Sequence, residues 1–453
     1  MNRQSIVALF VAGLFAVACG DSDGNEATNG EPHTNQSPPE NTDVGSSNND
    51  TGPDGPTYHA DIKPLMQAHC TECHVENSIA PFALDTYEVV RATAPLSYES
   101  MVDGTMPPWP PADDCQSFQG HRGMSQEEID LFQAWMDADY LEGEPEVSDL
   151  SHEEDPGDQD LTAPDLTLEW GFDFTPDPQG GDGVDDYRCF VIDPELDEEV
   201  FVSMVHTRPG NPGIVHHMIA YVISSDQMDE VDILKAEDSG PGYSCFGGPR
   251  VSSPEMLAGW VPGDRPQPYE PGHGVRLSED SLVVVQMHYN TVNDPEGTDR
   301  TELDLYFIDE EEFPDPTELV IIPQGAFDLF LAAGDAEAEA VNVADQIPFG
   351  VTLHGIAPHM HLLGTEIRAD ISYGGGEMCL VHIPEWDFNW QGFYLYEEPI
   401  RLIPPLQTTL TCRYDNSPEN QPPGRTPQDV TWGDGTYDEM GLVYNIVERP
   451  PGV

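Results

Sequence analysis

The sequence predicts a mainly β protein in which two antiparallel β-sandwich domains follow a small all-α domain. Three observations indicate this class. Pro (43) and Gly (41) together approach a fifth of the 453 residues, which favours turn-rich β structure over helix bundles. From about residue 165 onward, short β-rich runs alternate with Pro/Gly-rich turns, a spacing typical of antiparallel sandwiches. Before that point, residues 58–140 carry helical patterns.

The first 19 residues predict an export signal. Arg3 precedes an apolar run, residues 6–18, which is too short to span a bilayer comfortably and ends in small residues before Cys19. This end of the run resembles a bacterial lipoprotein lipobox, in which Cys19 would be lipidated. An ordinary signal peptide with a coincidental cysteine is the alternative. We therefore expect an exported bacterial lipoprotein, held at the periplasmic face of a membrane or at the cell surface by its lipid anchor alone.

The charge of the chain excludes one class of partner. It has 84 acidic against 16 basic residues, for a formal net charge of −68. Such a chain repels phosphate backbones, so we expect no nucleic-acid binding. The acidic residues are spread along the whole sequence, which indicates a protein that works in salty water, where screening relaxes self-repulsion. An acidic secreted protein without this adaptation is the alternative.

Changes in composition divide the chain further. Residues 20–57 contain almost no large apolar side chain and should form a disordered tether. Residues 141–164 form a second, acidic linker. An acidic, Pro-containing stretch, residues 309–316, divides the β-rich region into residues 165–312 and 313–453, each of suitable length for one domain.

Cys70, Cys73 and His74 form a CxxCH motif. Two thiols at this spacing can form thioethers to a haem, and the adjacent imidazole can then ligate its iron. Exported chains are where this attachment usually takes place, so the signal sequence supports a covalently bound haem c. A disulfide or half of a zinc site is the alternative for the paired cysteines.

The sixth ligand of such a haem should be a downstream methionine. We expect Met106, because the prolines around it hold its loop rigid, and regard Met101 and Met124 as weaker candidates. Ser125 and Glu128 form a capping box ahead of a helix with one apolar face. Residues 58–140 thus resemble a small class I cytochrome c domain.

The β-rich region contains four motifs with histidine or methionine. They are His-His-Met at 216–218, Gln-Met-His-Tyr at 286–289, His-Met-His at 359–361 and Asp-Glu-Met at 438–440. A strand places His359 and His361 on one face, and a nearby thioether would make a site suited to copper, especially Cu(I). His216 and His217 would point to opposite faces unless a strand end or an irregularity intervenes. With His288 they would form an all-nitrogen site for copper or zinc. Hydrogen-bonded core histidines are the alternative.

In this order, the four motifs resemble those of the copper type II, ascorbate-dependent monooxygenases, the family of peptidylglycine α-hydroxylating monooxygenase and dopamine β-monooxygenase. The resemblance covers roughly residues 165–450. It implies two jelly-roll-like β-sandwich domains, with one copper ion in each, across a solvent-filled cleft. It assigns the electron-storing copper to His216, His217 and His288. It assigns the catalytic, dioxygen-binding copper to His359, His361 and Met440.

The same resemblance implies disulfide pairs. Cys189 and Cys245 match positions that are bonded in the first domain of the family. Cys379 and Cys412 are then the natural pair in the second domain, although the family partner of Cys412, just after the methionine, is Gly441 here. Cys115 is left over and could be free.

The substrate positions depart from the peptide-amidating members. An Arg and an Asn that hold a peptide carboxylate there are Ala357 and Leu442 here, whereas Tyr444 is retained as a substrate residue. Without the Arg the carboxylate fork is lost, so we expect a neutral or cationic small molecule.

The expected reaction is insertion of one oxygen atom of O2 into a C–H bond of this small organic substrate. Electrons would come from the attached haem or from an external reductant, either ascorbate-like or a redox protein. A non-enzymatic copper and haem electron-transfer lipoprotein, or a sandwich that binds zinc or calcium, are the alternatives.

Overall fold

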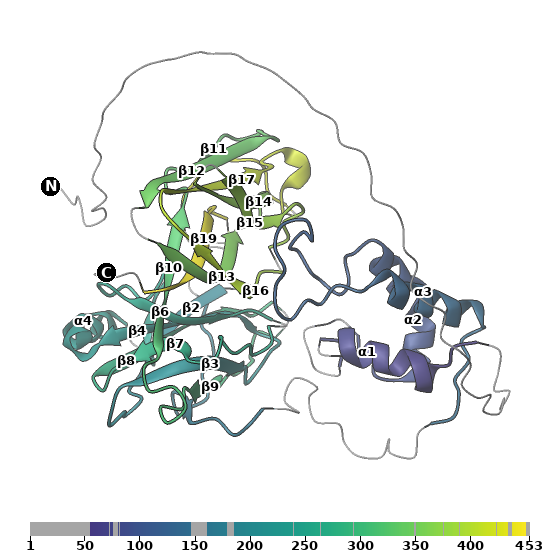
Figure 1. Ribbon diagram of the computed structural model, residues 1–453, viewed down its shortest axis with the longest axis horizontal. Helices are drawn as coiled ribbons and strands as arrows, with labels where there is room; N and C mark the ends of the chain where they lie inside the picture. The colour runs from purple at the N-terminus through teal and green to yellow at the C-terminus, as the bar shows by residue number, and fades with distance from the viewer. Residues whose placement is uncertain are drawn as a thin grey trace, which may run out of the picture. The chain divides into compact units, whose positions relative to one another are not determined.

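The computed structural model describes residues 55–71, 73–75, 80, 82–145, 161–178, 185–238, 240–262, 264–292, 294–347, 350–374, 376–388, 390–422, 424–433 and 437–449. All of them fall in one compact unit, Pro53–Val453. The predicted signal sequence with Cys19, nearly all of the tether and residues 146–160 of the acidic linker lie outside the described residues. The described part is mainly β, with several sheets, as the sequence predicts (Figure 1). Within it, no helix is both long and apolar enough to cross a membrane.

Helices occupy the N-terminal part of the described chain. They are η1 (Tyr58–Ile62), α1 (Lys63–His69), α2 (Tyr87–Val102) and α3 (Gln126–Asp137). The predicted capping box is confirmed: the Ser125 side chain accepts the backbone N–H of Glu128, and the Glu128 carboxylate accepts the N–H of Ser125. The helices enclose their own apolar core, in which Phe132 and Trp135 are fully buried. Burial of these aromatic faces is what holds such short helices together.

The first half of the β region supplies nine strands, one short 3-10 helix and one α-helix. They are β1 (Leu166–Leu168), β2 (Asp185–Ile192), β3 (Val200–Arg208), β4 (Val215–Ser224), η2 (Ser225–Gln227), α4 (Met228–Glu237), β5 (Tyr243–Ser244), β6 (Glu255–Trp260), β7 (His273–Leu277), β8 (Ser281–Asn290) and β9 (Glu302–Phe307). Strands β5-β2-β8-β4-β6 form an antiparallel five-stranded sheet.

The second half continues with ten strands and one short 3-10 helix. They are β10 (Thr317–Gly325), β11 (Phe330–Leu331), β12 (Ala338–Ile347), β13 (Val351–Met360), β14 (Gly364–Tyr373), β15 (Gly376–Ile383), β16 (Tyr394–Leu402), β17 (Leu406–Tyr414), η3 (Pro418–Asn420), β18 (Val430–Thr431) and β19 (Gly441–Glu448). Strands β12-β17-β14-β15 form a four-stranded sheet, and β11 pairs with β18.

An eight-stranded sheet, β1-β9-β3-β7-β10-β19-β13-β16, joins the two halves through the parallel pair β7–β10. Its first four strands share one buried core with the five-stranded sheet, represented by Val202 and Phe190. Its last strands share a second core with the four-stranded sheet, represented by Ile356 and Leu410. Two antiparallel sandwiches therefore lie side by side on one continuous sheet.

The segment between α2 and α3 reaches the second sandwich. Ala112 donates its N–H to His382 O at 2.8 Å, and Gln119 donates to Leu395 O at 2.8 Å. Between these points Phe118 is 3% exposed and belongs to the core of the second sandwich. Cys115 is bonded to Cys379. Covalent, backbone and apolar contacts thus anchor this segment.

That bond corrects one predicted disulfide. Cys189–Cys245 is confirmed, but the pairing of Cys379 with Cys412 is wrong, and Cys115 is not free. Strand β14 lies between β15, which carries Cys379, and β17, which carries Cys412. Two strand spacings amount to about 9.5 Å, beyond the Cα separation of about 7 Å that a disulfide can bridge. Cys412 is a buried free thiol.

Candidate metal centre

A β-bulge brings the first three histidines together. In the β4–β8 ladder Val215 pairs with Tyr289 and His217 with His288, so His216 is the extra residue of the bulge. The predicted irregularity is therefore present. Nδ1 of His217 lies 3.3 Å from Nδ1 of His216 and 3.3 Å from Nδ1 of His288. Nitrogens about 2.0 Å from one metal in a tetrahedral arrangement are separated by about 3.3 Å. The three imidazoles have the spacing of a metal site.

The environment of this cluster keeps its imidazoles neutral and oriented. Nε2 of His288 donates to Asp185 Oδ1 at 3.0 Å, which leaves Nδ1 as the ligand atom. The Tyr187 ring stacks on the His288 ring, with centroids 4.2 Å apart. Burial lowers the pKa of His217 and His288 well below the ordinary value, and lowers the pKa of His216. Neutral imidazole is the form that binds a metal.

The second set of ligands lies where strand β13 ends. The rings of His359 and His361 have centroids 5.0 Å apart. Nδ1 of His359 lies 2.6 Å from Gln391 Oε1, and Nδ1 of His361 lies 3.1 Å from the Asp438 carbonyl oxygen. Since both oxygens accept hydrogen bonds, both Nδ1 atoms carry a proton, and Nε2 of each ring is left as the ligand atom. Burial lowers the pKa of His359 to about 3.

Met440 is positioned by the strand pair β13–β19 and by one buried carboxylate. Met360 pairs with Gly441, so Met440 precedes a residue that lies opposite the His-Met-His motif. The Glu439 carboxylate accepts backbone N–H groups from Met440, Leu363 and His361. Glu439 is 0% exposed, and burial raises its pKa to about 8. One side chain thus holds the backbone of both motifs together.

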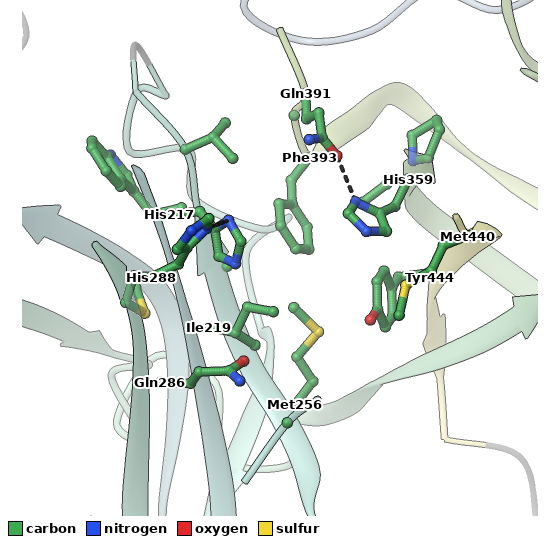
Figure 2. A pocket seen from close by; sticks show the side chains of 18 of the residues that line it. His217, Ile219, Met256, Gln286, His288, His359, Gln391, Phe393, Met440 and Tyr444 are labelled. Carbon is green, nitrogen blue, oxygen red and sulfur yellow. Dashed lines mark hydrogen bonds between the residues drawn. The ribbon is translucent and has the colours of Figure 1, made fainter. Parts of the chain in front are cut away.

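Members of both ligand sets, though not His216, line one pocket, a cavity of about 160 Å³. Figure 2 shows His217 and His288 on one side, His359 and Met440 on the other, and apolar side chains between them. His361, Tyr444 and Ala357 also line this pocket. The lining residues not predicted from the sequence include Ile219, Met256, Trp260, Gln286, Phe388, Gln391 and Phe393.

Phe388 links the two clusters. Its ring centroid lies 5.4 Å from that of His216 and 6.0 Å from that of His361. The separation of the two histidine rings cannot exceed the sum of these distances. The chemistry of the donors fits copper at both places: three imidazole nitrogens at one, and two imidazole nitrogens with a thioether in the same pocket at the other.

The predicted haem ligands follow helix α1. Among the described cysteines, Cys70 and Cys73 belong to no disulfide, and the N–H of His74 donates to Cys70 O at 2.8 Å in the turn that contains the motif. Nδ1 of His74 donates to Phe82 O at 2.9 Å, which leaves Nε2 to face an iron. Two cysteines outside any disulfide and an oriented imidazole fit covalent haem attachment.

The three candidate methionines differ in their burial and packing. Met101 is buried in the helical core and Met124 packs against it. Met106 is half-buried just after α2, and its N–H donates to Ser100 O at 3.2 Å. The choice of Met106 as the axial ligand stays a prediction.

Sequence reasoning missed the residues that orient the ligands. Asp185 lies four residues before Cys189, and Glu439 is the central residue of the Asp-Glu-Met motif, but no sequence pattern gives either carboxylate a role. Gln391 and Phe388 lie about thirty residues from the nearest motif, in a connection with no pattern of its own. Only the folded backbone brings them to the histidines.

No family model matches the chain. DBH-like monooxygenase protein 1 of Gallus gallus is 25% identical in an alignment of 255 positions that covers 51% of this chain and 38% of that protein. The chain thus spans under two fifths of the length of this relative. The name of this relative describes a monooxygenase, and about half of this chain is similar to part of it.

Similar solved structures include two viral proteins. The major capsid protein P2 from Bacteriophage PM2 has a TM-score of 0.22 and 7% identity, and covers 58% of this chain and 97% of its own. A Sulfolobus Turreted Icosahedral Virus structure has a TM-score of 0.24 and 10% identity, and covers 63% of this chain and 88% of its own. Likenesses of this size do not define a shared fold or function.

Proposed function

We propose that the chain is a copper-dependent monooxygenase that hydroxylates a C–H bond of a small organic substrate with O2. The observation that carries this proposal is that one pocket is lined by His217 and His288 from one sandwich and by His359, His361 and Met440 from the other. The monooxygenase relative supports it. Two bound copper ions would supply the activation of O2 and the electrons for inserting one oxygen atom while the other leaves as water.

The residues of the chain have separate tasks in this reaction. Asp185 and Gln391 hold one ring of each cluster in the tautomer that offers its other nitrogen to the metal. Glu439 fixes the backbone that carries His361 and Met440. Apolar side chains around the pocket, such as Phe393, exclude water from the reacting atoms.

The pocket also indicates the class of substrate. Ala357 and Leu442 are each 4% exposed. They occupy the positions at which the amidating enzymes have an Arg and an Asn that bind the carboxylate of the substrate. Ala357 and Tyr444 line the cavity, so a methyl group and a phenol, and no Arg or Lys side chain of the described residues, line this part of it. A substrate carboxylate would be buried there without a counter-charge, at a cost of several kcal/mol. We therefore propose a neutral or cationic small molecule.

We further propose that a haem c bound in the helical part delivers electrons to the copper centres, beside or instead of an external reductant. Trp109, three residues after Met106, packs on Tyr394 with ring centroids 5.6 Å apart. Trp109 and Tyr394 line a small cavity together with Gln391, whose amide contacts His359. The predicted axial-ligand loop is thus continuous with the surroundings of His359. Anchoring on a membrane through Cys19 belongs to the same proposal.

Metal analysis and product analysis test this function. We expect two copper ions per chain, and O2 uptake coupled to a hydroxylated product when neutral and cationic amines or aromatic compounds are screened. Met440→Ala should lose one copper and the product. Met256→Leu, which alters another methionine of the same pocket, should keep both copper ions. Copper binding without any hydroxylated product would favour the electron-transfer alternative.

A further inference from the structure

A second cluster of metal-ligating side chains lies outside the copper pocket. One ligand atom each from Glu270, His273 and His354 lies within 4.8 Å of the other two. The rings of His273 and His354 have centroids 4.7 Å apart. Glu448 adds a carboxylate oxygen 3.7 Å from Nε2 of His354. We propose that this cluster binds a divalent transition-metal cation such as Zn²⁺ between the two sandwiches.

The ligands come from both halves of the β region. His273 is the first residue of β7, and Glu270 lies in the turn before it, where its carbonyl oxygen accepts the N–H of His273 at 3.0 Å. His354 is the extra residue of a bulge in β13, between Leu353 and Gly355. In the eight-stranded sheet β10 and β19 lie between β7 and β13, so the side chains converge over the strands where the sandwiches join.

The buried ring of His354 has a nitrogen atom with unsatisfied hydrogen-bonding capacity. The residue is 4% exposed, and among the described residues its Nε2 has no hydrogen-bond partner. The Glu448 oxygen at 3.7 Å is beyond hydrogen-bond distance. A buried polar atom left in this state destabilises the folded protein. A cation that Nε2 could ligate would remove this cost.

The second imidazole is already oriented for a metal. Nδ1 of His273 donates to Pro271 O at 3.2 Å, so Nε2 is its acceptor atom. This arrangement, a backbone carbonyl behind a ligating ring, is the usual support of metal-bound histidines. Burial and the neighbouring His273 lower the pKa of His354, which keeps that ring in the neutral form.

The donor set indicates which cation binds. Two imidazole nitrogens with one or two carboxylate oxygens suit Zn²⁺ in a tetrahedral arrangement, and the cluster has no sulfur that would favour Cu(I). Side-chain rotations that move each ligand atom by about 1 Å would bring these atoms to the spacing of about 3.3 Å that such a site requires. None of these four residues lines the copper pocket, so the site is separate and does not depend on the proposed oxygenase function.

A cation here would connect the sandwiches. It would bind the folded chain and not the unfolded one, because the ligands come from positions far apart in sequence, and would therefore stabilise the native state by mass action. By holding β7 against β13 and β19, it would also fix how the two copper ligand sets face each other.

Zinc titration of the full-length protein tests the proposal. The chain is first loaded with copper at its other sites, then exposed to ZnCl2 and desalted. We expect one zinc per chain by mass spectrometry of the metals, and a higher melting temperature with zinc than without. His273→Gln and Glu270→Gln alter half-buried residues and should still fold, and each should weaken zinc binding at least tenfold. His354→Gln should abolish it.

His382→Gln is the matched control. This histidine is also half-buried and lies 3.3 Å from a carboxylate, Glu366, but it belongs to the four-stranded sheet away from the cluster. It should bind zinc as the wild type does. The proposal is overturned if the copper-loaded wild type binds no zinc, if His273→Gln binds as much as the wild type, or if His382→Gln loses zinc to the same extent.

Discussion

Cys115 and Cys379 form a disulfide across 264 residues of sequence, and it ties the segment after α2 to strand β15. Replacing both by Ser should loosen this segment, which is otherwise held by apolar contacts of Phe118 and Trp109 and by a few hydrogen bonds from its backbone and glutamine side chains. We expect a loss of about 2–4 kcal/mol in the free energy of unfolding. Denaturant unfolding under oxidising conditions measures it.

Peptide mapping under non-reducing conditions checks the pairing itself. It should yield one linked peptide pair containing Cys115 and Cys379. Cys412 should react with an alkylating agent only after unfolding, because burial raises its pKa to about 12 and removes it from solvent. A linked pair containing Cys412 would contradict the structure.

The cysteines show what sequence reasoning could and could not reach. The bond between Cys189 and Cys245 was predicted correctly, because the family resemblance implied it. Cys379 was paired wrongly because its partner lies in the helical part, and nothing local in a sequence reports which loop crosses to which sheet. The capping box at Ser125 was predictable for the opposite reason, since every group that makes it lies within three residues.

The metal ligands also differ in how far the sequence alone could predict their arrangement. His359 and His361 were predicted to share a face because strand periodicity alone determines this. For His216 and His217 the sequence could state only that an irregularity was required, and the bulge supplied it. The partners of the ligands could not be predicted, because Gln391 reaches His359 only through the packing of a distant connection.

Asp185→Asn should weaken copper binding at the three-histidine site by about 10–100-fold, because the carboxylate that orients His288 is lost. The other copper site should be unaffected. A competition titration with a Cu(I) chelator resolves the two affinities. Asp186→Asn is the control, since Asp186 bonds to the N–H of Asp177 instead. Equal loss in both variants would mean that the effect is only one of charge.

Glu439→Gln replaces one of the two carboxylate oxygens with an amide NH2 group. That group cannot accept hydrogen bonds from the backbone N–H groups that position His361 and Met440. We expect copper to fall from two ions to one per chain, with the three-histidine site retained. Asp438→Asn is the matched neighbour, because Asp438 contacts His361 through its backbone carbonyl. Retention of both copper ions in Glu439→Gln would show that Glu439 does not position the site.

The metal-free protein should lose stability in acid through its buried histidines. The pKa of His359 is about 3 in the folded state, against about 6.5 in the unfolded chain. Between these values the unfolded state binds a proton that the folded state does not, so stability falls as pH falls below about 6.5. The melting temperature of the apo protein should drop from pH 7.5 to 4.5. The drop should be smaller in His359→Asn, and an equal drop would refute the assignment.

The last prediction concerns the rate at which a bound haem delivers electrons to the copper centres. In stopped-flow mixing with O2, the ferrous haem of the copper-loaded protein should be reoxidised faster than that of copper-free protein. Trp109→Leu should reduce this difference without changing haem content, because Trp109 is the contact between the loop after Met106 and the Tyr394 side of the His359 site. Trp170→Leu, which changes a half-buried tryptophan stacked on Phe190 in the first sandwich, should leave it unchanged. If copper does not accelerate reoxidation in the wild type, the haem is not the donor, and an external reductant must reach the pocket directly.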